Sequence, residues 1–272
     1  MNEWKPTKII RMLNAHVADT ATNPAVVQTD AGTGYLKAIE NDSGSDALAR
    51  EFVATSLAEL VGLSTFKYCL FDFDGKLEVI LSNGAKVEKG MEFMTKEEQG
   101  INGKAAMSML NHLVNKDHIA RLICFDTFVR NVDRCYIYNG KRHVNWDNVF
   151  LAHAPRGRFL LKAMDFSHAF WGNLDNAMDK ADNVNDEEIY GLFPEFSRFL
   201  KKSIVVEVCK ALTKIQNNDV HAIIDSIPVD WNIGQDTREA WIRFIIGRAD
   251  FVANNFLRLS GLDTSRLIFK ET

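Results

Sequence analysis

The chain has 272 residues and a formal net charge of −4, with 46% hydrophobic and 25% charged residues. This is the composition of an ordinary globular protein, long enough for one two-lobed domain or two small ones. The negative charge argues against broad binding to nucleic acid or to a membrane surface, and no apolar run is long enough to cross a membrane.

The four cysteines show neither a Cys-x-x-Cys pair nor a metal-binding spacing with histidine; they are Cys69, Cys124, Cys135 and Cys209. Such cysteines are typical of reduced, inert thiols. The N-terminal residues also lack the apolar segment of a signal peptide. We therefore expect a cytoplasmic protein.

The first hundred residues are predicted to form mostly strands, with one helix between them. Residues 25–28 and 34–40 have strand composition around the turn TDAGTG, which predicts a hairpin. Residues 43–63 carry apolar side chains at helical spacing, and Gly62 can end this helix. Lys37 lies in the second strand and Glu51 in the helix. A lysine that contacts nucleotide phosphates needs such a glutamate to hold it, although an edge-strand lysine and a solvated glutamate are the plainer interpretation.

Residues 70–77, LFDFDGKL, are similar to the nucleophile loop of haloacid-dehalogenase-type phosphatases, with Asp72 as nucleophile and Asp74 as acid/base. That loop requires a parallel strand followed by a crossover helix. Here a second β-rich run, 76–81, follows at once, and Asp74-Gly75 between two such runs predicts a two-residue hairpin turn. The chain also contains no Gly-Asp dipeptide for the later acidic motif. The phosphatase is therefore kept only as a remote alternative.

From about residue 103 the pattern becomes helical, with amphipathic helices predicted over 116–131, 203–216 and 236–259. A β-rich front and a helical back half predict an α+β protein of two lobes, residues 1–95 and 96–272. The seam between them is expected within 88–100. Glu92, Phe93 and Met94 lie in this seam, where an adenine base would contact backbone and apolar side chains; an ordinary linker is the alternative.

The most specific pattern lies in the middle of the chain, where Asp133-Arg134 is followed by Asn148 with apolar residues after it, and then by Asp165-Phe166. Phosphoryl transfer needs an aspartate to accept the proton of the attacking hydroxyl, and an asparagine and an aspartate to hold Mg²⁺. A set of turn-forming residues is the alternative. The 15 positions between Asp133 and Asn148 include Asn139-Gly140, which predicts an inserted hairpin and leaves Asn145 as a rival metal ligand.

These residues resemble those of the HipA-like kinases, bacterial relatives of the protein-kinase fold. The resemblance covers nearly the whole chain, through ATNPAVVQTDAGTGYLKAIE, ALAREFVATSLAELVGL, FDTFVRNVDR, MDFSHAF, IPVDW and REAWIRFIIGRAD. It implies a two-lobed protein-kinase-like fold with one αC-like helix in a β-rich N-lobe. It also implies that Asp133 is the catalytic aspartate and that Asn148 and Asp165 bind the metal. Lys37 would contact phosphate with Glu51 as its partner.

The resemblance further implies ATP and Mg²⁺ as cofactors, with Thr20 and Thr22 in the phosphate-covering segment 19–24. It implies phosphorylation of a hydroxyl on a protein or small molecule, with Ser/Thr protein kinase activity, and an antitoxin-like partner as in toxin–antitoxin systems. The segment lacks Gly-x-Gly-x-x-Gly, and Ser167 stands where Asp-Phe-Gly would place glycine. A nucleotide-binding pseudokinase or regulatory module is therefore the alternative.

Three neighbours of these residues keep two interpretations each. Asp126 lies seven residues before Asp133, either holding the loop or exposed on the surface. Arg134 is either structural or directed at phosphate. His168 either approaches phosphate or metal, or is a hydrogen-bonded structural residue.

Overall fold

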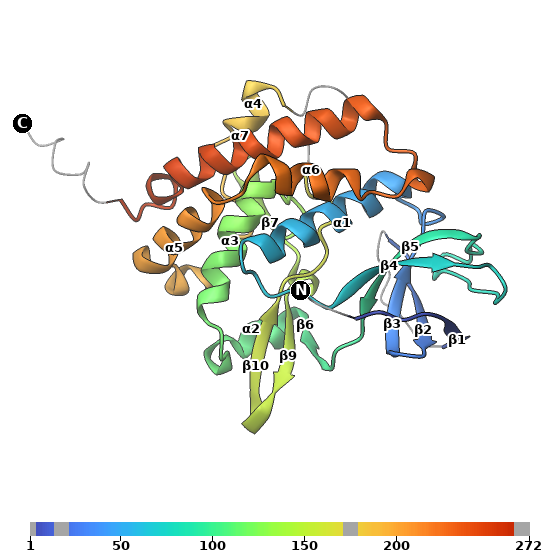
Figure 1. Cartoon of the computed structure of the whole chain (residues 1–272). Coiled ribbons are helices and arrows are strands. Elements are labelled where there is room, and N and C mark those ends of the chain that lie inside the picture. The colour runs from blue at the N-terminus through green and yellow to red at the C-terminus, as the bar shows by residue number, and fades with distance from the viewer. Residues whose placement is uncertain (1–3, 14–21, 171–178, 264–272) are drawn as a thin grey trace, which may run out of the picture.

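The computed structural model describes residues 4–13, 22–170 and 179–263. Its strands are β1 (Ile9–Met12), β2 (Ala25–Thr29), β3 (Gly32–Lys37), β4 (Tyr68–Phe73), β5 (Gly90–Lys96), β6 (Gly100–Asn102), β7 (Cys135–Tyr138), β8 (Lys141–Val144), β9 (Phe150–Ala154) and β10 (Arg158–Lys162). Its helices are α1 (Gly44–Leu60), α2 (Gly103–Ser108), α3 (Asp117–Val129), α4 (Ala181–Val184), α5 (Lys202–Leu212), α6 (Asn217–Asp225) and α7 (Gln235–Leu259). Figure 1 shows a sheet of N-terminal strands at one end and most of the helices at the other.

The N-terminal strands form one five-stranded sheet in the order β1-β2-β3-β5-β4, with every pairing antiparallel. The predicted hairpin is confirmed, because β2 pairs with β3 from Thr29↔Gly32 to Ala25↔Leu36. Lys37 is the last residue of β3 and pairs with Phe93 of β5. Because β3 is hydrogen-bonded on both sides, the backbone that carries Lys37 is held in the middle of the sheet.

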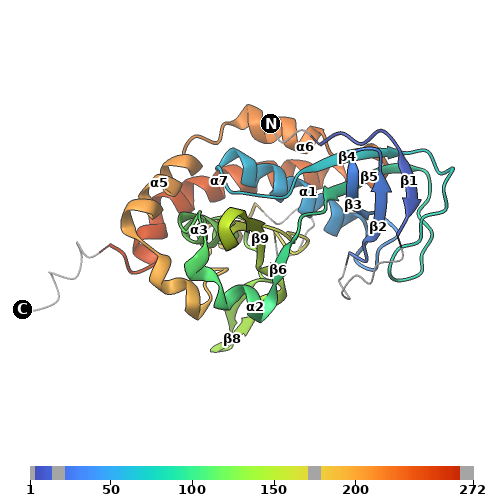
Figure 2. The same ribbon diagram turned by 90° about the horizontal axis from the view of Figure 1, so that it is seen from below.

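The predicted helix over 43–63 is confirmed as α1, and it lies between the sheet and the C-terminal helices (Figures 1 and 2). Gly62 ends the helix in a left-handed conformation with φ of 70°, which a residue without a Cβ adopts at low cost. The far side of α1 meets α6 and the turn at 229–231. The indole Nε1 of Trp231 also donates to the carbonyl oxygen of Met91 at 2.7 Å. Residues from the C-terminal half therefore hold both α1 and β5.

The predicted hairpin at Asp74-Gly75 is wrong. The partner of β4 is β5, in register from Phe73↔Gly90 to Tyr68↔Thr95, and residues 76–81 form no strand beyond an isolated bridge between Ile80 and Lys86. Between the two strands the chain leaves the sheet. It buries apolar side chains in a small second core that also contains Phe71 and Met94, namely Leu81, Val79 and Val87. That burial replaces the predicted ladder.

The helices α3, α5, α6 and α7 share the larger hydrophobic core, which also includes one face of α1. Three of the four were predicted, and α6 was not. A second, three-stranded sheet in the order β10-β9-β6 lies against α2. None of the helices in the described ranges is long and apolar enough to cross a membrane.

The hairpin predicted at Asn139-Gly140 is confirmed. β7 and β8 pair from Cys135↔Val144 to Tyr138↔Lys141, so that these two residues alone form the loop. Both have positive φ, 50° and 72°, the geometry that Asn-Gly favours in two-residue turns.

Candidate active site

A cavity of about 600 Å³ lies where the five-stranded sheet faces the segments that follow α3 and β10. Its lining includes six of the ten residues to which the sequence assigns a catalytic, nucleotide-binding or metal-binding role, namely Thr22, Lys37, Glu51, Asp133, Asn148 and Asp165, besides Asn145 and His168. They come from segments up to 143 residues apart, from Thr22 to Asp165 (165 − 22). The fold therefore brings the predicted catalytic and metal-binding groups into one cleft.

Lys37 and Glu51 form an ion pair inside this cleft. The ammonium Nζ of Lys37 lies 2.5 Å from Oε1 and 2.6 Å from Oε2 of Glu51. Their side chains are 12% and 5% exposed. Burial works to raise the pKa of Glu51, and the ammonium opposes that effect. The pair fixes the lysine at the end of β3 with its charge directed at the cavity.

The loop after α3 is shaped by the way that helix ends. Arg130 caps α3 in the left-handed conformation, with φ of 51° and ψ of 54°, which turns the chain sharply toward the cleft. The side-chain amide nitrogen of Asn131, Nδ2, then donates to Asp126 Oδ1 at 3.1 Å and to the carbonyl oxygen of Asp165 at 3.4 Å. Asp133 follows two residues later, with its backbone N–H donating to Asn131 Oδ1 at 3.4 Å. Asn131 therefore joins α3, Asp133 and the segment of Asp165.

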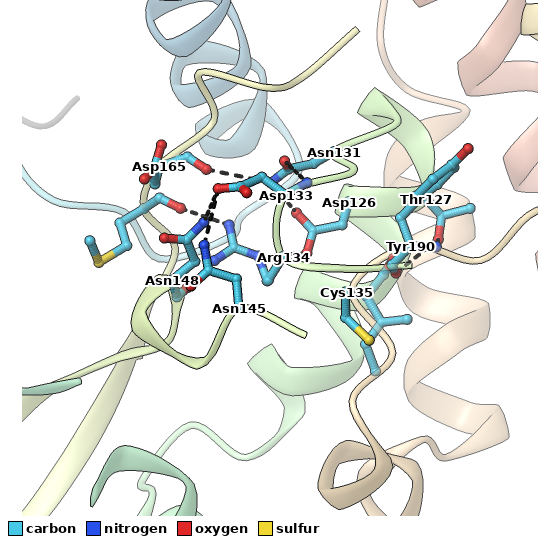
Figure 3. Close-up of polar contacts among 12 residues, drawn as sticks. Asp126, Thr127, Asn131, Asp133, Arg134, Cys135, Asn145, Asn148, Asp165 and Tyr190 are labelled. Carbon is cyan, nitrogen blue, oxygen red and sulfur yellow. Dashed lines mark hydrogen bonds and ion pairs between the residues drawn. The ribbon is translucent and has the colours of Figure 1, made fainter. Parts of the chain in front are cut away.

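Arg134 is the central connection beneath the site (Figure 3). Its guanidinium donates to Asp126 Oδ2 at 2.7 Å, to the carbonyl oxygen of Met164 at 2.7 Å, and to the carbonyl oxygen of Asn148. Both charged side chains of the Arg134–Asp126 pair are fully buried. Burial raises the pKa of Asp126, against the attraction of Arg134. The surface interpretation of Asp126 and the phosphate-facing interpretation of Arg134 are both wrong, since these residues position the loops from below.

Close approach of the chain to Asp126 requires a glycine at 191. A Cβ there would lie 2.3 Å from Asp126 Oδ2, and Gly191 has φ of 73°. Its N–H donates to the carbonyl oxygen of Cys135 at 2.7 Å. The segment around Gly191 is thus packed directly against the buried Arg134–Asp126 ion pair.

Asp133 is oriented by two asparagine amides. Its Oδ2 accepts from Asn148 Nδ2 at 2.6 Å and from Asn145 Nδ2 at 3.2 Å. The side chain is 32% exposed and opens to the cleft. Because the amide nitrogen of Asn148 contacts Asp133, its amide oxygen points away from that carboxylate. Asn148 is buried, whereas Asn145 is half-buried and also accepts from the N–H of Asp147 at 3.2 Å.

Asp165 is held in an uncommon backbone conformation, with φ of 55°, and this turns its carboxylate into the cleft. Ser167 Oγ donates to its Oδ1 at 2.8 Å. Burial works to raise the pKa of Asp165, but Lys37, the bond from Ser167 and Arg134 outweigh it and hold that pKa below its ordinary value. A carboxylate that stays ionised inside a cleft is suited to bind a cation.

His168 lies at the same edge of the cleft. Its Nδ1 is 3.1 Å from Ser167 Oγ and 3.8 Å from Asp133 Oδ2. It lines the cavity and is 33% exposed, so it is a polar neighbour of Asp133 and not a residue of the core.

The donor set fits a hard cation that keeps other ligands. Within the described ranges no group of three His, Cys, Asp or Glu side chains is arranged to hold a metal by itself. Asn148 and Asp165 supply two oxygen-bearing side chains on one side of the cleft. Mg²⁺ is commonly bound in this way, by one or two protein oxygens together with phosphates and water.

The predicted nucleotide contacts have mixed outcomes. Thr20 lies outside the described residues, and Thr22 is buried and lines the cleft. Glu92, Phe93 and Met94 were predicted to lie in the connection between the two lobes. That position is wrong, because all three lie within β5 and are buried. Phe93 faces the ring of Phe52, with centroids 6.1 Å apart, and none of the three lines the cavity.

The residues that line this part of the cleft lie at the end of β5, directly after it, or across from it. They are Thr95, Glu97, Glu98, Phe66, Phe150 and Met164. The sequence interpretation missed them because Glu92, Phe93 and Met94 are buried in succession and one of them is charged. Residues 90–96 therefore lack the alternating pattern by which a strand is recognised. The signal was the charged run Lys96-Glu97-Glu98, which begins at the last residue of that strand and marks the boundary between a buried strand and a connection.

An antiparallel sheet that carries a Lys–Glu pair, facing a helical part that carries Asp133, Asn148 and Asp165, is the arrangement of kinase-like folds. A solved structure with a similar fold is that of the proinflammatory kinase CtkA of Helicobacter pylori. It is similar to the present chain with a TM-score of 0.58 and 12% sequence identity, over 96% of this chain and 97% of that one. At this identity the likeness speaks to the fold alone.

A model of the HipA-like kinase family matches residues 9–256 of the sequence. The chain therefore belongs to the HipA-like kinase family, which supports a kinase-type phosphotransferase. A search of curated proteins found no match.

Proposed function

We propose that the protein is an ATP- and Mg²⁺-dependent phosphotransferase that transfers the γ-phosphate of ATP to a hydroxyl group, as a Ser/Thr protein kinase. The observation that carries the proposal is the convergence of Asp133, Asp165 and the Lys37–Glu51 pair on one cavity. Phosphoryl transfer depends mainly on positioning and on charge stabilisation, and these are the groups that supply both.

Each residue takes a role that follows from its contacts. Lys37, held by Glu51, would bind phosphate oxygens, and the N–H groups and hydroxyl near Thr22 would cover them. Asn148 and Asp165 would hold Mg²⁺, which neutralises charge on the phosphates when it is bound. Asp133, oriented by two amides, would orient the acceptor hydroxyl and take its proton.

The nucleotide would lie between the two lobes proposed for residues 1–95 and 96–272. The base would contact the connection after β5, at Glu97 and Glu98, and the apolar side chains of Phe66, Phe150 and Met164. An antitoxin-like protein partner follows from the family resemblance alone and remains a proposal.

A second candidate function is nucleotide binding without turnover. The observation that favours it is the β7–β8 hairpin, which separates Asp133 from Asn148 by 15 positions (148 − 133). Asp133 and Asn148 are nevertheless in contact at 2.6 Å, so the insertion does not break the pair. Turnover therefore remains the first proposal.

The test is incubation of the purified protein with Mg²⁺-ATP and a cell lysate, followed by phosphosite mass spectrometry and a nucleotide-binding titration. Wild type should produce new phosphoserine or phosphothreonine, and Asp133→Ala should lose this activity while it still binds nucleotide. Full activity in Asp133→Ala would refute the proposed base. Binding without any turnover in wild type would favour the second candidate.

A further inference from the structure

The β7–β8 hairpin begins two residues after Asp133 and ends one residue before Asn145. The side chains of Asp133 and Asn145 are hydrogen-bonded to each other, and this bond holds the two ends of the hairpin at the site. The hairpin is thus a projection from the catalytic loop itself. A molecule that contacts the hairpin near its base lies beside the proposed catalytic aspartate.

The hairpin exposes apolar and aromatic side chains to an unusual degree. Ile137 is 46% exposed, Tyr138 61% and Val144 39%, which makes three of the eight large hydrophobic residues found exposed in the described ranges. Tyr136 and His143 stack with ring centroids 4.9 Å apart and make the ribbon rigid near its base. Exposed apolar side chains that gather on one short element mark interaction surfaces.

One edge of the hairpin is open for pairing. Among residues 4–13, 22–170 and 179–263, β7 and β8 pair only with each other. On the β7 side, the carboxylate of Glu188 lies near the backbone N–H of Ile137. The outer edge of β8 therefore presents the unpaired backbone groups to which an extended peptide can add as a strand.

The charge of the hairpin is positive, in a chain whose net charge is −4. Residues 135–144 contain Lys141 and Arg142 and no acidic residue. Both cations lie on β8 and are exposed, and no ion pair in the described part of the chain includes them. The open edge thus carries uncompensated positive charge.

We propose that the β8 edge docks an extended, acidic segment of the polypeptide that accepts the phosphate. The proposal rests on the proposed function, for which it names the substrate class. Cys135 and Val144 pair at the base of the hairpin. Along β8, Arg142 and Lys141 lie two and three residues from Val144, or about 7 and 10 Å. An extended peptide has the same rise, so its acidic residues lie about two to four positions from the acceptor hydroxyl.

A polypeptide fits this surface better than a nucleic acid does. Strand addition uses backbone N–H and C=O groups that only a peptide can match. Two adjacent cations are also few for binding a phosphate backbone, particularly beside a cleft lined by Glu97, Glu98 and Asp147.

The experiment uses synthetic peptides with one serine in an alanine-rich background, carrying either glutamates or lysines two to four positions from it on either side. Phosphorylation is measured with wild type, with Lys141→Glu/Arg142→Glu, and with Lys201→Glu/Lys202→Glu. The last variant makes the same charge change at two exposed lysines at the start of α5. Alanine-for-serine versions, labelled with a fluorophore, measure binding by polarisation without any need for turnover.

We expect glutamate peptides to have the lower KM with wild type and with the α5 control. In the hairpin variant their KM and Kd should rise about five- to tenfold, since two exposed ion pairs with the acidic peptide are lost and replaced by like charges, while nucleotide affinity stays unchanged. An unchanged preference in the hairpin variant would overturn the inference, as would a labelled oligonucleotide that displaces the acidic peptide and binds more tightly. If acidic peptides bind through the hairpin but wild type phosphorylates nothing, the proposed function fails and the docking surface stands.

Discussion

Two stretches of the chain set an aspartate before phenylalanine, LFDFDGKL at 70–77 and KAMDFSHAF at 162–170, and their surroundings have little in common. Asp72 is exposed on β4, an edge strand of the five-stranded sheet. Asp74 pairs with Lys76 through side chains that are 57% and 85% exposed. Asp165 instead lines the cleft, where the charges of Lys37 and of the buried Arg134 act on its carboxylate. Residues distant in sequence decide which aspartate is suited to chemistry.

The two surroundings lower a carboxyl pKa in different ways. The pKa of Asp74 lies below its ordinary value because of hydrogen bonds from Lys76, two residues away and in open solvent. The pKa of Asp165 is lowered by Lys37, by the hydrogen bond from Ser167 and by Arg134, against the effect of burial. Only the second arrangement places an ionised carboxylate in a partly buried cleft, and there its charge acts on a ligand with less screening than in open solvent.

The strongest test of this difference exchanges each aspartate for asparagine. Asp165→Asn removes the charge that would hold Mg²⁺ in the cleft, and we expect it to lower phosphate transfer about a thousandfold, or roughly 4 kcal/mol. Asp72→Asn, the matched control, should retain wild-type kcat. The measurement is Mg²⁺-ATP turnover at saturating acceptor. If Asp72→Asn abolished activity and Asp165→Asn did not, the assignment of the two stretches would be reversed.

Local signals were enough for part of this architecture. Asn139-Gly140 predicted a hairpin and forms one, because positive φ at both residues suits a two-residue loop. Asp74-Gly75 carried the same kind of signal and forms no hairpin. There the following residues bury Val79 and Leu81 in the second core, and β5 takes the place beside β4. Turn chemistry fixes the turn, whereas tertiary burial decides which strand pairs next.

The site was more predictable than the wall of the cleft. Lys37, Asp133, Asn148 and Asp165 were predicted because phosphoryl transfer needs those residue types in that order, and all four line the cleft. The support beneath them, in which Arg134 connects Asp126 to two backbone carbonyls, depends on contacts across 30 residues. Neither interpretation of Arg134 could be chosen from sequence, since its burial is set by how α3 and the later loops pack.

The second prediction concerns the contacts of Arg134 beneath the site, because the LFDFDGKL stretch has no comparable buried ion pair. Arg134→Met leaves the carboxylate of Asp126 buried without its cation, and breaking such a pair should lower the free energy of unfolding by about 3 kcal/mol. The measurement is chemical denaturation monitored by tryptophan fluorescence. Arg243→Met, which removes a pair with Asp179 at a side chain that is 55% exposed, is the control and should leave stability nearly unchanged, because exposed ion pairs contribute little. Equal losses in the two variants would contradict the supporting role of Arg134.

The third prediction concerns how pH changes stability through Glu92. This residue of β5 pairs with Phe71 of β4, the strand that carries LFDF. Burial, together with Glu40 and Asp230, raises the pKa of Glu92 to about 8. The folded state therefore holds a proton that the unfolded chain loses at its ordinary pKa. The stability that this proton contributes is complete below the unfolded pKa, and it is lost as pH rises from about 4.5 toward 8.

Between pH 5 and pH 9 we expect the free energy of unfolding of wild type to fall by about 2 kcal/mol more than that of Glu92→Gln. Denaturant titrations at several pH values measure this difference, and Glu78→Gln, at an exposed glutamate of the same region, is the control. Parallel curves for wild type and Glu92→Gln would show that Glu92 ionises in the folded protein as it does in water.

The smallest effect is expected at the turn of LFDFDGKL itself. Gly75 has φ of 72°, and a Cβ there would lie 3.2 Å from Lys89 Cβ, so Gly75→Ala should destabilise the protein by about 1 kcal/mol. Gly234→Ala is the control, since Gly234 has φ of −62° and open space around its Cβ position, and it should be neutral. The informative readout is kcat beside stability. If Gly75→Ala lowers the unfolding midpoint and leaves kcat unchanged, the conspicuous Asp-Gly serves the course of the chain between β4 and β5. A loss of turnover larger than the loss of stability would instead connect this turn to the cleft.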